Sequence, residues 1–497
     1  MFSCSSYGVS QGRGWPRHAL ALAAMCVCNV AWATDESASP GPVAGVLSEV
    51  VVRARAEAPL PEVASPLREA EGRAMRAASS DTARLLQGVP GVALYGAGGL
   101  SSLPVIHGLA DDRLRIQVDG MDLVSACANH MNPPLSYLDP SQVRQVRVWA
   151  GIAPVSAGGD SIGGTIQVDS AEPVFAAPGE GPLRQGEAGL YYRSNGHAYG
   201  GHLAATWTSE QFSLRYHAAT AQADNHRAGD AFKPAGLAAA GRGWLAADEV
   251  GSTAYESRNQ SLALGWRQDR HLWELKLGVQ DVPYQGFANQ RMDMTGNDST
   301  QFNLRYQGRY DWGQWEARAW NEHTRHRMQF GDDKLYWYGS TVAGMPMDTD
   351  GHNSGLNVKA DVALNERDLL RVGGGWQRYR LDDWWLPSGG MMMAPNTFWN
   401  INGGERDRLA LFGEWEARWS ERWLTLFGVR HEQVDMAAGA VQGYNGMYSS
   451  DALVFNAAQR QRQDHNLDLV ALARFTPSTE QHYEFGYAMK TRSPNLY

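Results

Sequence analysis

The sequence predicts an exported membrane β-barrel that follows a small N-terminal α+β domain. Three observations lead to this fold class. The chain starts with an export signal, no apolar run of about 20 residues follows that signal, and the C-terminal three fifths alternate apolar with polar side chains. With 43% hydrophobic residues and 18 tryptophans among 497, it is not a disordered chain. The net charge of −9 argues against a nucleic-acid binder, which needs a basic surface.

Residues 1–33 have the pattern of a secretory signal peptide. Basic residues precede an apolar run of about 12 residues at 19–30, and Ala31-Trp32-Ala33 supplies the small residues of a cleavage site. Residues 34–59 are rich in Ser, Pro and Gly and lack periodicity, so they predict a flexible tether. One short β-prone patch, at about 47–54, interrupts this tether.

Residues 60–180 predict a compact α+β domain. Asp81 is placed to cap a short amphipathic helix, and Pro90-Gly91 ends it. The segments 114–118 and 143–149 alternate as strands between Gly-rich turns. About 120 residues suffice for a modest core.

Residues 181–497 predict the barrel. In one segment, apolar Leu409 and Leu411 have odd positions and therefore share one strand face, whereas Glu414 and Glu416 have even positions and share the other. Polar connections such as 222–254 join such segments. A second long connection is expected at 331–352. Uneven loops and abundant Trp and Tyr are typical of outer-membrane barrels. A soluble β-sandwich or propeller is the alternative, but the export signal and the strand length favour the barrel.

The strand count indicates an incomplete barrel. We count about 13 candidate strands between residues 187 and 490, whereas a barrel plugged by such a domain needs roughly 22 strands. Residues 492–497 look like a loop rather than a closing strand. An open sheet would leave unpaired edges in lipid. We therefore expect a C-terminally truncated chain; the alternative is that the irregular loops contain further weak strands.

The order of signal, tether, small domain and barrel resembles TonB-dependent outer-membrane receptors. Several short elements carry this resemblance, although His107 stands where the family usually has Arg. They are 85–92 (the start of the plug domain), 104–108 (Pro-x-Ile-Arg-Gly), 118–120 (the Asp-Gly turn), and 146–151 and 163–168 (the last plug strands). Each is a weak signal alone, but their order is specific.

The resemblance implies transport without catalysis. The patch Ser48, Glu49, Val50, Val51 and Val52 resembles the TonB box, which the TonB energy-coupling protein of the inner membrane would pull. It further implies a family-type 22-stranded barrel around the plug domain, in the outer membrane of a Gram-negative bacterium and in contact with its lipid. The sequence has no phosphate-binding loop, zinc-hydrolase His pair or nucleophile elbow, so we expect no enzyme.

A cysteine and a methionine follow the Asp-Gly turn. Cys4, Cys26 and Cys28 lie in the signal, so Cys127 is the one thiol expected in the mature chain, four residues before Met131. Soft sulfur ligands select Cu(I), and less sharply Zn²⁺. A lone cysteine can equally be a small buried hydrophobe or an intermolecular disulfide partner.

A second donor pair lies on a predicted barrel strand. His326 and Met328 have the same parity as Glu316 and Arg318, so they are expected to face the lumen. We expect Trp320, an apolar exception on that face, to sit near the rim. Side chains at positions i and i+2 of a strand share one face and lie about 6–7 Å apart, which is close enough for both donors to bind one ion. A polar lumen wall with an incidental methionine is the alternative.

Together these pairs resemble the copper-receptor branch of the family. That branch is understood to bind copper through Cys-x-x-x-Met on the plug and His-x-Met on the barrel. The resemblance assigns Cys127, Met131, His326 and Met328 as ligands of a transported copper ion, with Cu(I) favoured by ligand softness. His130 is expected to be an outer-shell residue, although a direct ligand is also possible.

Further methionines fall in predicted loops and are candidates for a low-affinity capture path. The alternative is that they fill space beneath the loops. They are Met292, Met294, Met345, Met347, Met391, Met392 and Met393.

Two other functions remain open at this stage. A receptor for a metal chelate (siderophore, haem or cobalamin) would have a large aromatic or basic site and could dispense with Cys127. A non-transporting surface protein would need no TonB box.

Overall fold

The computed structural model describes residues 63–497 except 67–68, 97, 240–241, 335–336, 339–341, 344–345 and 389–391. The predicted signal peptide, tether and TonB box lie outside the described residues. In the part of the chain that is described, no helix has the length and apolarity needed to cross a membrane.

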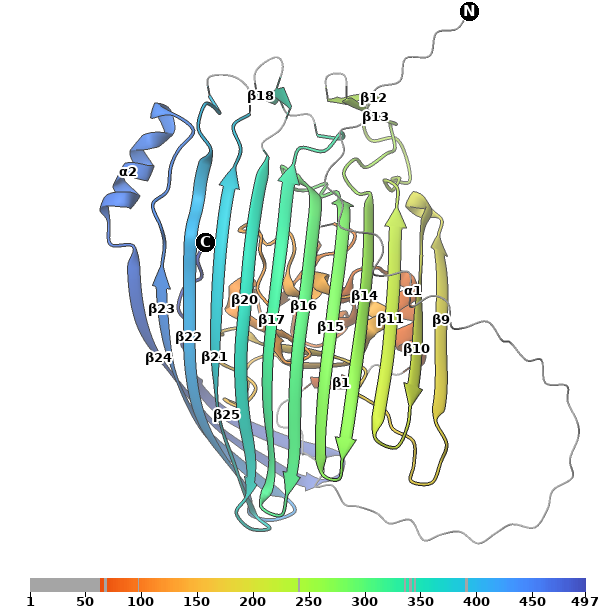
Figure 1. Cartoon of the computed structure of the whole chain (residues 1–497), viewed down its shortest axis with the longest axis vertical. Coiled ribbons are helices and arrows are strands. Elements are labelled where there is room, and N and C mark those ends of the chain that lie inside the picture. Colours follow the sequence, from red (N-terminus) through yellow and green to blue (C-terminus); the bar gives the residue numbers. More distant parts are fainter. Residues whose placement is uncertain are drawn as a thin grey trace, which may run out of the picture. The chain divides into compact units, whose positions relative to one another are not determined.

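The N-terminal part of the described chain is a small α+β domain, enclosed by long strands (Figure 1). One mixed sheet has the order β1-β7-β8-β5-β6, with β5 and β8 parallel, and a second has the order β2-β3-β4. Its strands are β1 (Val63–Pro66), β2 (Val92–Gly96), β3 (Ser102–Ile106), β4 (Leu109–Ala110), β5 (Leu114–Val118), β6 (Met121–Asp122), β7 (Val143–Trp149) and β8 (Gly164–Ser170). Its helices are α1 (Glu69–Ala78) and the 3₁₀ turns η1 (Thr82–Leu86), η2 (Asp111–Arg113), η3 (Pro134–Tyr137) and η4 (Pro140–Gln142).

Local sequence chemistry explains several of these elements. The Asp81 carboxylate accepts a hydrogen bond from the Ala83 amide and caps η1, as expected. Asp119 and Gly120 both have positive φ, 49° and 72°, and form the tight turn between β5 and β6. The predicted strands 114–118 and 143–149 are confirmed as β5 and β7.

The C-terminal part forms one antiparallel sheet of 13 strands, and the strand count expected from the sequence is confirmed. Neighbours in the sheet are neighbours along the chain. The strands are β9 (Leu183–Arg193), β10 (Ala198–Thr208), β11 (Phe212–Ala223), β14 (Tyr255–Gln268), β15 (His271–Gln285), β16 (Asp293–Tyr310), β17 (Gly313–Gln329), β20 (Met347–Ala363), β21 (Asp368–Trp385), β22 (Phe398–Arg418), β23 (Trp423–Ala437), β24 (Gln461–Ser478) and β25 (Gln481–Met489). Residues 492–497 are irregular, as predicted.

Tight turns join the strands at one end of the sheet and long connections at the other (Figure 1). The long connections carry small elements of their own: β12 (Gly236–Ala239), β13 (Arg242–Leu245), β18 (Trp337–Tyr338), β19 (Val342–Ala343), η6 (Gly446–Tyr448) and α2 (Ser449–Ala457). A further 3₁₀ turn, η5 (Asn195–His197), joins β9 to β10. The connection expected at 331–352 is shorter than predicted, because β20 already begins at Met347.

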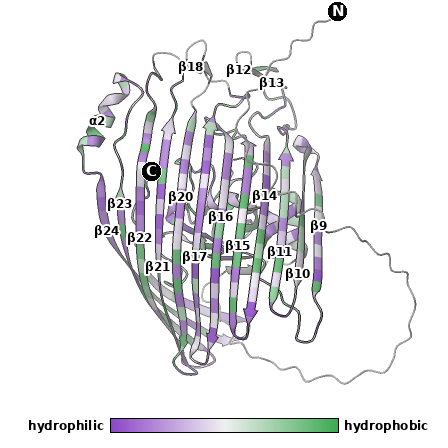
Figure 2. Cartoon of the chain, viewed as in Figure 1, coloured by the Kyte–Doolittle hydropathy of each residue, from purple (hydrophilic) through white to green (hydrophobic). Residues whose placement is uncertain are grey.

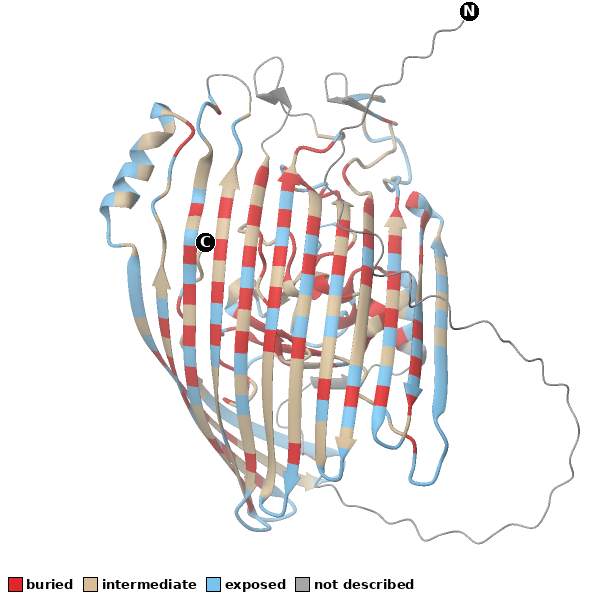
Figure 3. Cartoon of the chain, viewed as in Figure 1, coloured by how far each residue is buried: buried red, intermediate tan, exposed pale blue. Residues whose placement is uncertain are grey.

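Most of the long strands, although not the edge strand β25, alternate between an outward and an inward face (Figures 2 and 3). In β22, Leu409 and Leu411 are exposed, whereas Ala410, Glu414 and Glu416 are buried. The exposed face is therefore apolar around mid-strand, and the polar face is covered from inside by the N-terminal domain. This alternation is typical of the wall of a β-barrel.

The core of the N-terminal domain includes one side chain from the surrounding sheet. Trp320 of β17 is buried among residues such as Leu86, Ile116 and Val148. Its expected position near the rim is wrong. The even residues of β17 face inward, and residue 320 lies mid-strand, level with that core.

Buried ion pairs also join the domain to the sheet. Asp122 of β6 accepts two hydrogen bonds from Arg115 (2.7 and 2.9 Å) and one from Arg408 of β22 (2.7 Å). Burial alone would raise the pKa of Asp122, but the two guanidiniums hold that pKa well below its usual range. Asp160 accepts a hydrogen bond from Arg406, which also lies in β22, at 2.7 Å. The neighbouring guanidiniums lower the pKa of Asp160 in the same way.

Candidate metal centre

The loop that follows β6 presents two sulfur atoms inside the molecule. Cys127 and Met131 are both buried, with 0% and 2% of their surface exposed. The amide of His130 donates to the Cys127 carbonyl at 2.9 Å and closes a tight turn. The Cys127 and Met131 side chains belong to one buried cluster. The Asn132 side-chain oxygen accepts from the Cys127 amide (3.1 Å) and from the Ser125 hydroxyl (2.6 Å), which fixes the loop.

The sheet presents a row of three thioethers on its inward face. Met328 of β17 lies directly opposite Met294 of β16 on one side and Met347 of β20 on the other. All three are almost completely buried. Direct cross-strand partners have Cβ atoms about 4.5–5.5 Å apart, so the three side chains are close neighbours.

The loop sulfurs and the sheet sulfurs belong to one buried cluster. Its sulfur-bearing members are Cys127, Met131, Met292, Met294, Met328 and Met347. The predicted loop positions of Met294 and Met347 are wrong: both lie in strands, and Met292 immediately precedes one. The ends of these strands are polar, so their sequences resemble loops. A register prediction for β16, β17 and β20 would have aligned the three methionines.

His326 stands two residues from Met328 on the same inward face. Its Nδ1 atom is 3.2 Å from the Asn297 side-chain oxygen, which only accepts hydrogen bonds. Nδ1 therefore carries the proton and donates it, and Nε2 is left with a free lone pair. Within the described residues Nε2 is buried and has no hydrogen-bond partner. This is the tautomer that a metal ligand requires.

A chain of amides connects this histidine to the cysteine loop. Asn132 donates from Nδ2 to Asn297 at 3.0 Å, and Asn132 also accepts from the Cys127 amide. One polar network thus orients both the plug side and the barrel side of the site. No local motif marks Asn132 or Asn297, because their roles depend on a contact between residues 165 positions apart in the chain.

The environment of Cys127 keeps its thiol protonated when no metal is present. Burial raises the pKa of this thiol to about 11. A soft metal ion would have to displace the proton, because the thiolate is the form that binds metals.

The other predicted residues lie elsewhere. The His130 ring packs edge-on against Tyr497 (centroids 5.2 Å apart) and its Nδ1 is 3.9 Å from Asp111, so these ring contacts lie outside the sulfur cluster. In the connection after β21, Met392 is exposed and Met393 is buried. Met345 and Met391 lie outside the described residues.

Comparisons with known proteins agree with this architecture. Residues 69–165 match the family model of the TonB-dependent receptor plug domain. No curated protein matches the chain in sequence.

Several solved structures share the fold. The structure of the copper transporter OprC is 20% identical over 84% of this chain and 61% of its own, with a TM-score of 0.69. The FrpB iron transporter from Neisseria meningitidis is 16% identical over 86% of this chain and 63% of its own, with a TM-score of 0.62. The ferric citrate transporter FecA is 11% identical over 84% of this chain and 60% of its own, with a TM-score of 0.61.

The plug-domain match and the shared architecture define the class of fold: a plug domain packed against a barrel-type antiparallel sheet. Residues 69–165 match the plug domain of TonB-dependent receptors, and the chain shares its fold with solved transporters of this architecture. It spans about three fifths of the length of the solved structures that it resembles.

Proposed function

We propose that this receptor takes up copper ions and that Cys127, Met131, His326 and Met328 bind the ion. Thiolate, imidazole and thioether donors together suit Cu(I), which prefers soft ligands. One observation carries the proposal: the buried Nε2 of His326 has no hydrogen-bond partner among the described residues, and His326 lies two residues from Met328 of the sulfur cluster. An unpaired buried nitrogen is costly unless a ligand uses it.

The burial of the donors favours a bare ion over an organic chelate. Cys127 and Met328 are completely buried and Met131 nearly so, and they pack on one another in one cluster. A chelate such as a siderophore or haem needs a wide cavity with several polar groups around it. The likeness to the copper transporter OprC supports the same substrate, although iron and ferric citrate transporters share the fold.

Met294 and Met347 extend the donor set on both sides of Met328. Reversible thioether ligands could pass a Cu(I) ion along this row without a strongly bound intermediate. This replaces the proposed loop capture path for these two residues with a path along the inner wall.

Coupling to TonB completes the proposal. The receptor would lie in the outer membrane, bind copper on the plug, and offer Ser48–Val52 to TonB in the periplasm. A short extended strand can pair with a partner's sheet edge and transmit a pull. Ion pairs such as Asp122–Arg408 would resist that pull until the plug is remodelled.

Competition with a Cu(I) chelator tests the ligand assignment. Met328→Leu should weaken Cu(I) binding by at least tenfold, because it removes a donor and keeps the packing volume. Met447→Leu is the matched control, since Met447 is exposed and outside the cluster. Equal affinities in the two variants would contradict the assignment.

Copper accumulation in cells tests the coupling. Deleting residues 47–54 should abolish accumulation while Cu(I) binding to the purified chain is unchanged. Accumulation that survives the deletion would instead support a non-transporting surface protein.

A further inference from the structure

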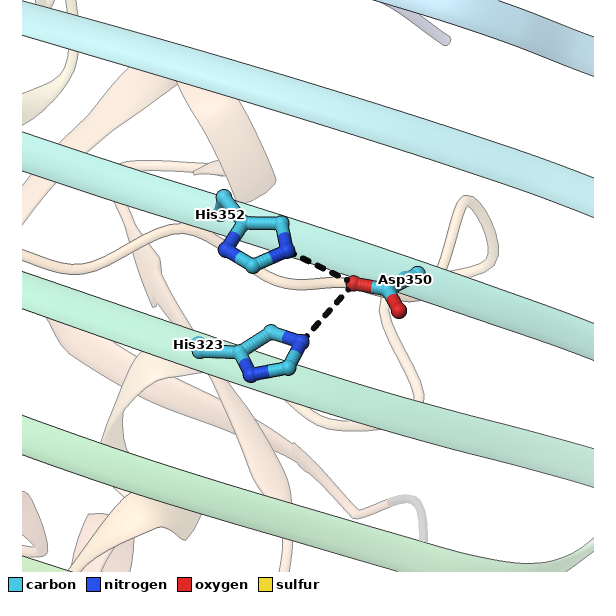
Figure 4. A group of neighbouring side chains, drawn as sticks. All are labelled: His323, Asp350 and His352. Carbon is cyan, nitrogen blue, oxygen red and sulfur yellow. Dashed lines mark hydrogen bonds and ion pairs between the residues drawn. The ribbon is translucent and has the colours of Figure 1, made fainter.

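Three metal-ligating side chains meet on the outward face of the sheet, away from the sulfur cluster. His323 of β17 and His352 of β20 are direct cross-strand partners, and their rings stack with centroids 3.9 Å apart. The same carboxylate oxygen of Asp350 lies 2.9 Å from Nε2 of His323 and 3.1 Å from Nε2 of His352 (Figure 4). All their ligand atoms lie within 4.8 Å of one another.

Strand alternation separates this group from the proposed copper site. In β17 the even residues from Trp320 to Met328 are buried, whereas Asn321 and Arg325 are exposed. His323 shares the parity of these exposed residues. His352 is itself exposed, so the group is open to solvent from outside the barrel.

The group lies beyond the apolar band of the outer wall. The last apolar outward pair on these two strands is Ala319 and Leu356, and Asn321–Ser354 and then His323–His352 follow toward the long connections. Four residues along a strand cover about 13 Å. The histidines therefore lie in the polar rim, where a hydrated ion has access without crossing hydrocarbon.

Neighbouring positive charges are already matched by other carboxylates. Arg327 pairs with Asp348 at 2.8 Å, and Arg380 pairs with Asp407 at 2.6 Å. Arg325 lies 3.4 Å from the second oxygen of Asp350, so the oxygen between the two imidazoles remains available. The local field therefore does not exclude a cation.

We propose that His323, Asp350 and His352 form a binding site for a borderline divalent transition-metal ion, Zn²⁺ or Cu²⁺. Two imidazoles and one carboxylate are a donor set that both ions accept, with further positions left to water. Where an Nε2 carries a proton toward the carboxylate, ion binding at that Nε2 moves the proton to Nδ1 of the same ring or to water. This site is independent of the proposed copper transport and differs from it in ligand softness.

Zinc titration of the whole chain in detergent tests the site. Removing a residue that only supports a metal ligand lowers metal affinity about 10–100-fold. Because His323 and His352 would be direct ligands, His323→Ala or His352→Ala should weaken Zn²⁺ binding by at least tenfold. His465→Ala is the matched control. His465 forms another exposed imidazole stack with His431, its diagonal neighbour on the adjacent strand (centroids 5.6 Å apart), yet these two belong to no three-ligand group within the described residues.

A spectroscopic readout keeps the test independent of folding. Electron paramagnetic resonance of added Cu²⁺ should show two nitrogen ligands in the wild type and in His326→Ala, and should lose that pattern in His323→Ala. Asp350→Asn, which preserves side-chain shape, should weaken Zn²⁺ binding as well. Equal Zn²⁺ affinity in His323→Ala and His465→Ala would overturn the proposal. Loss of Cu(I) binding alone, with the Zn²⁺ site intact, would bear only on the copper site.

Discussion

Replacing Asp122 by Asn should detach the plug domain from the sheet wall. The Asp122 carboxylate is 8% exposed and receives three charge-assisted hydrogen bonds, two from Arg115 and one from Arg408. The amide cannot balance these two buried guanidiniums. Removing one partner of a buried ion pair costs about 3–5 kcal/mol. Arg408 keeps weaker contacts with Asp160 and Glu432 at 3.5 and 3.9 Å, so we expect the lower end, about 3 kcal/mol.

The loss of stability is measured by urea denaturation of the refolded chain, with limited proteolysis of the plug domain as the readout of unfolding. Asp407→Asn is the control, because Asp407 also receives short bonds from two arginines, Arg378 and Arg380, but on the exposed face. Exposed pairs contribute at most about 1 kcal/mol. Equal losses of stability in the two variants would refute the argument that burial makes the Asp122 network strong.

Three further predictions concern pH, tautomer and thiol chemistry. The pKa values of Asp122 and Asp160 are lowered in the folded chain, so their stabilisation is complete above the unfolded value of 3.8 and is lost as pH falls below it; plug proteolysis should accelerate there, and a flat profile would contradict this. Asn297→Leu should weaken Cu(I) binding about 10–100-fold in a chelator competition, since His326 loses the acceptor that orients its ring. Alkylation of metal-free Cys127 near neutral pH should be at least about a hundredfold slower than in the urea-unfolded chain, because its pKa rises from 9.0 to about 11; similar rates would show an accessible thiolate.

Periodicity was enough to predict most of the fold. Alternation over ten or more residues is a strong local signal, and it identified the 13 strands and the inward face that carries His326 and Met328. Trp320 was misplaced because a large apolar side chain on an inward face makes sense only once the plug core is known to lie against it.

The site was predictable in part. Short motifs indicated Cys127, Met131, His326 and Met328, but the motifs could not indicate which other methionines join them. Met294 and Met347 depend on strand register, and Asn132 and Asn297 on a long-range contact between plug and sheet. The pairing of His323 with His352 also depends on strand register, so it could not be predicted from the sequence.

Copper content of the purified chain tests the central claim most directly. The chain would be incubated in detergent with excess copper under reducing conditions, desalted, and analysed for metal in the wild type, Cys127→Ala, His326→Ala and the control His465→Ala. We expect about one tightly held copper per wild-type and control chain, and its loss in Cys127→Ala and His326→Ala. The same copper content in all four proteins, or none in any, would contradict it and leave a metal-chelate receptor as the better explanation.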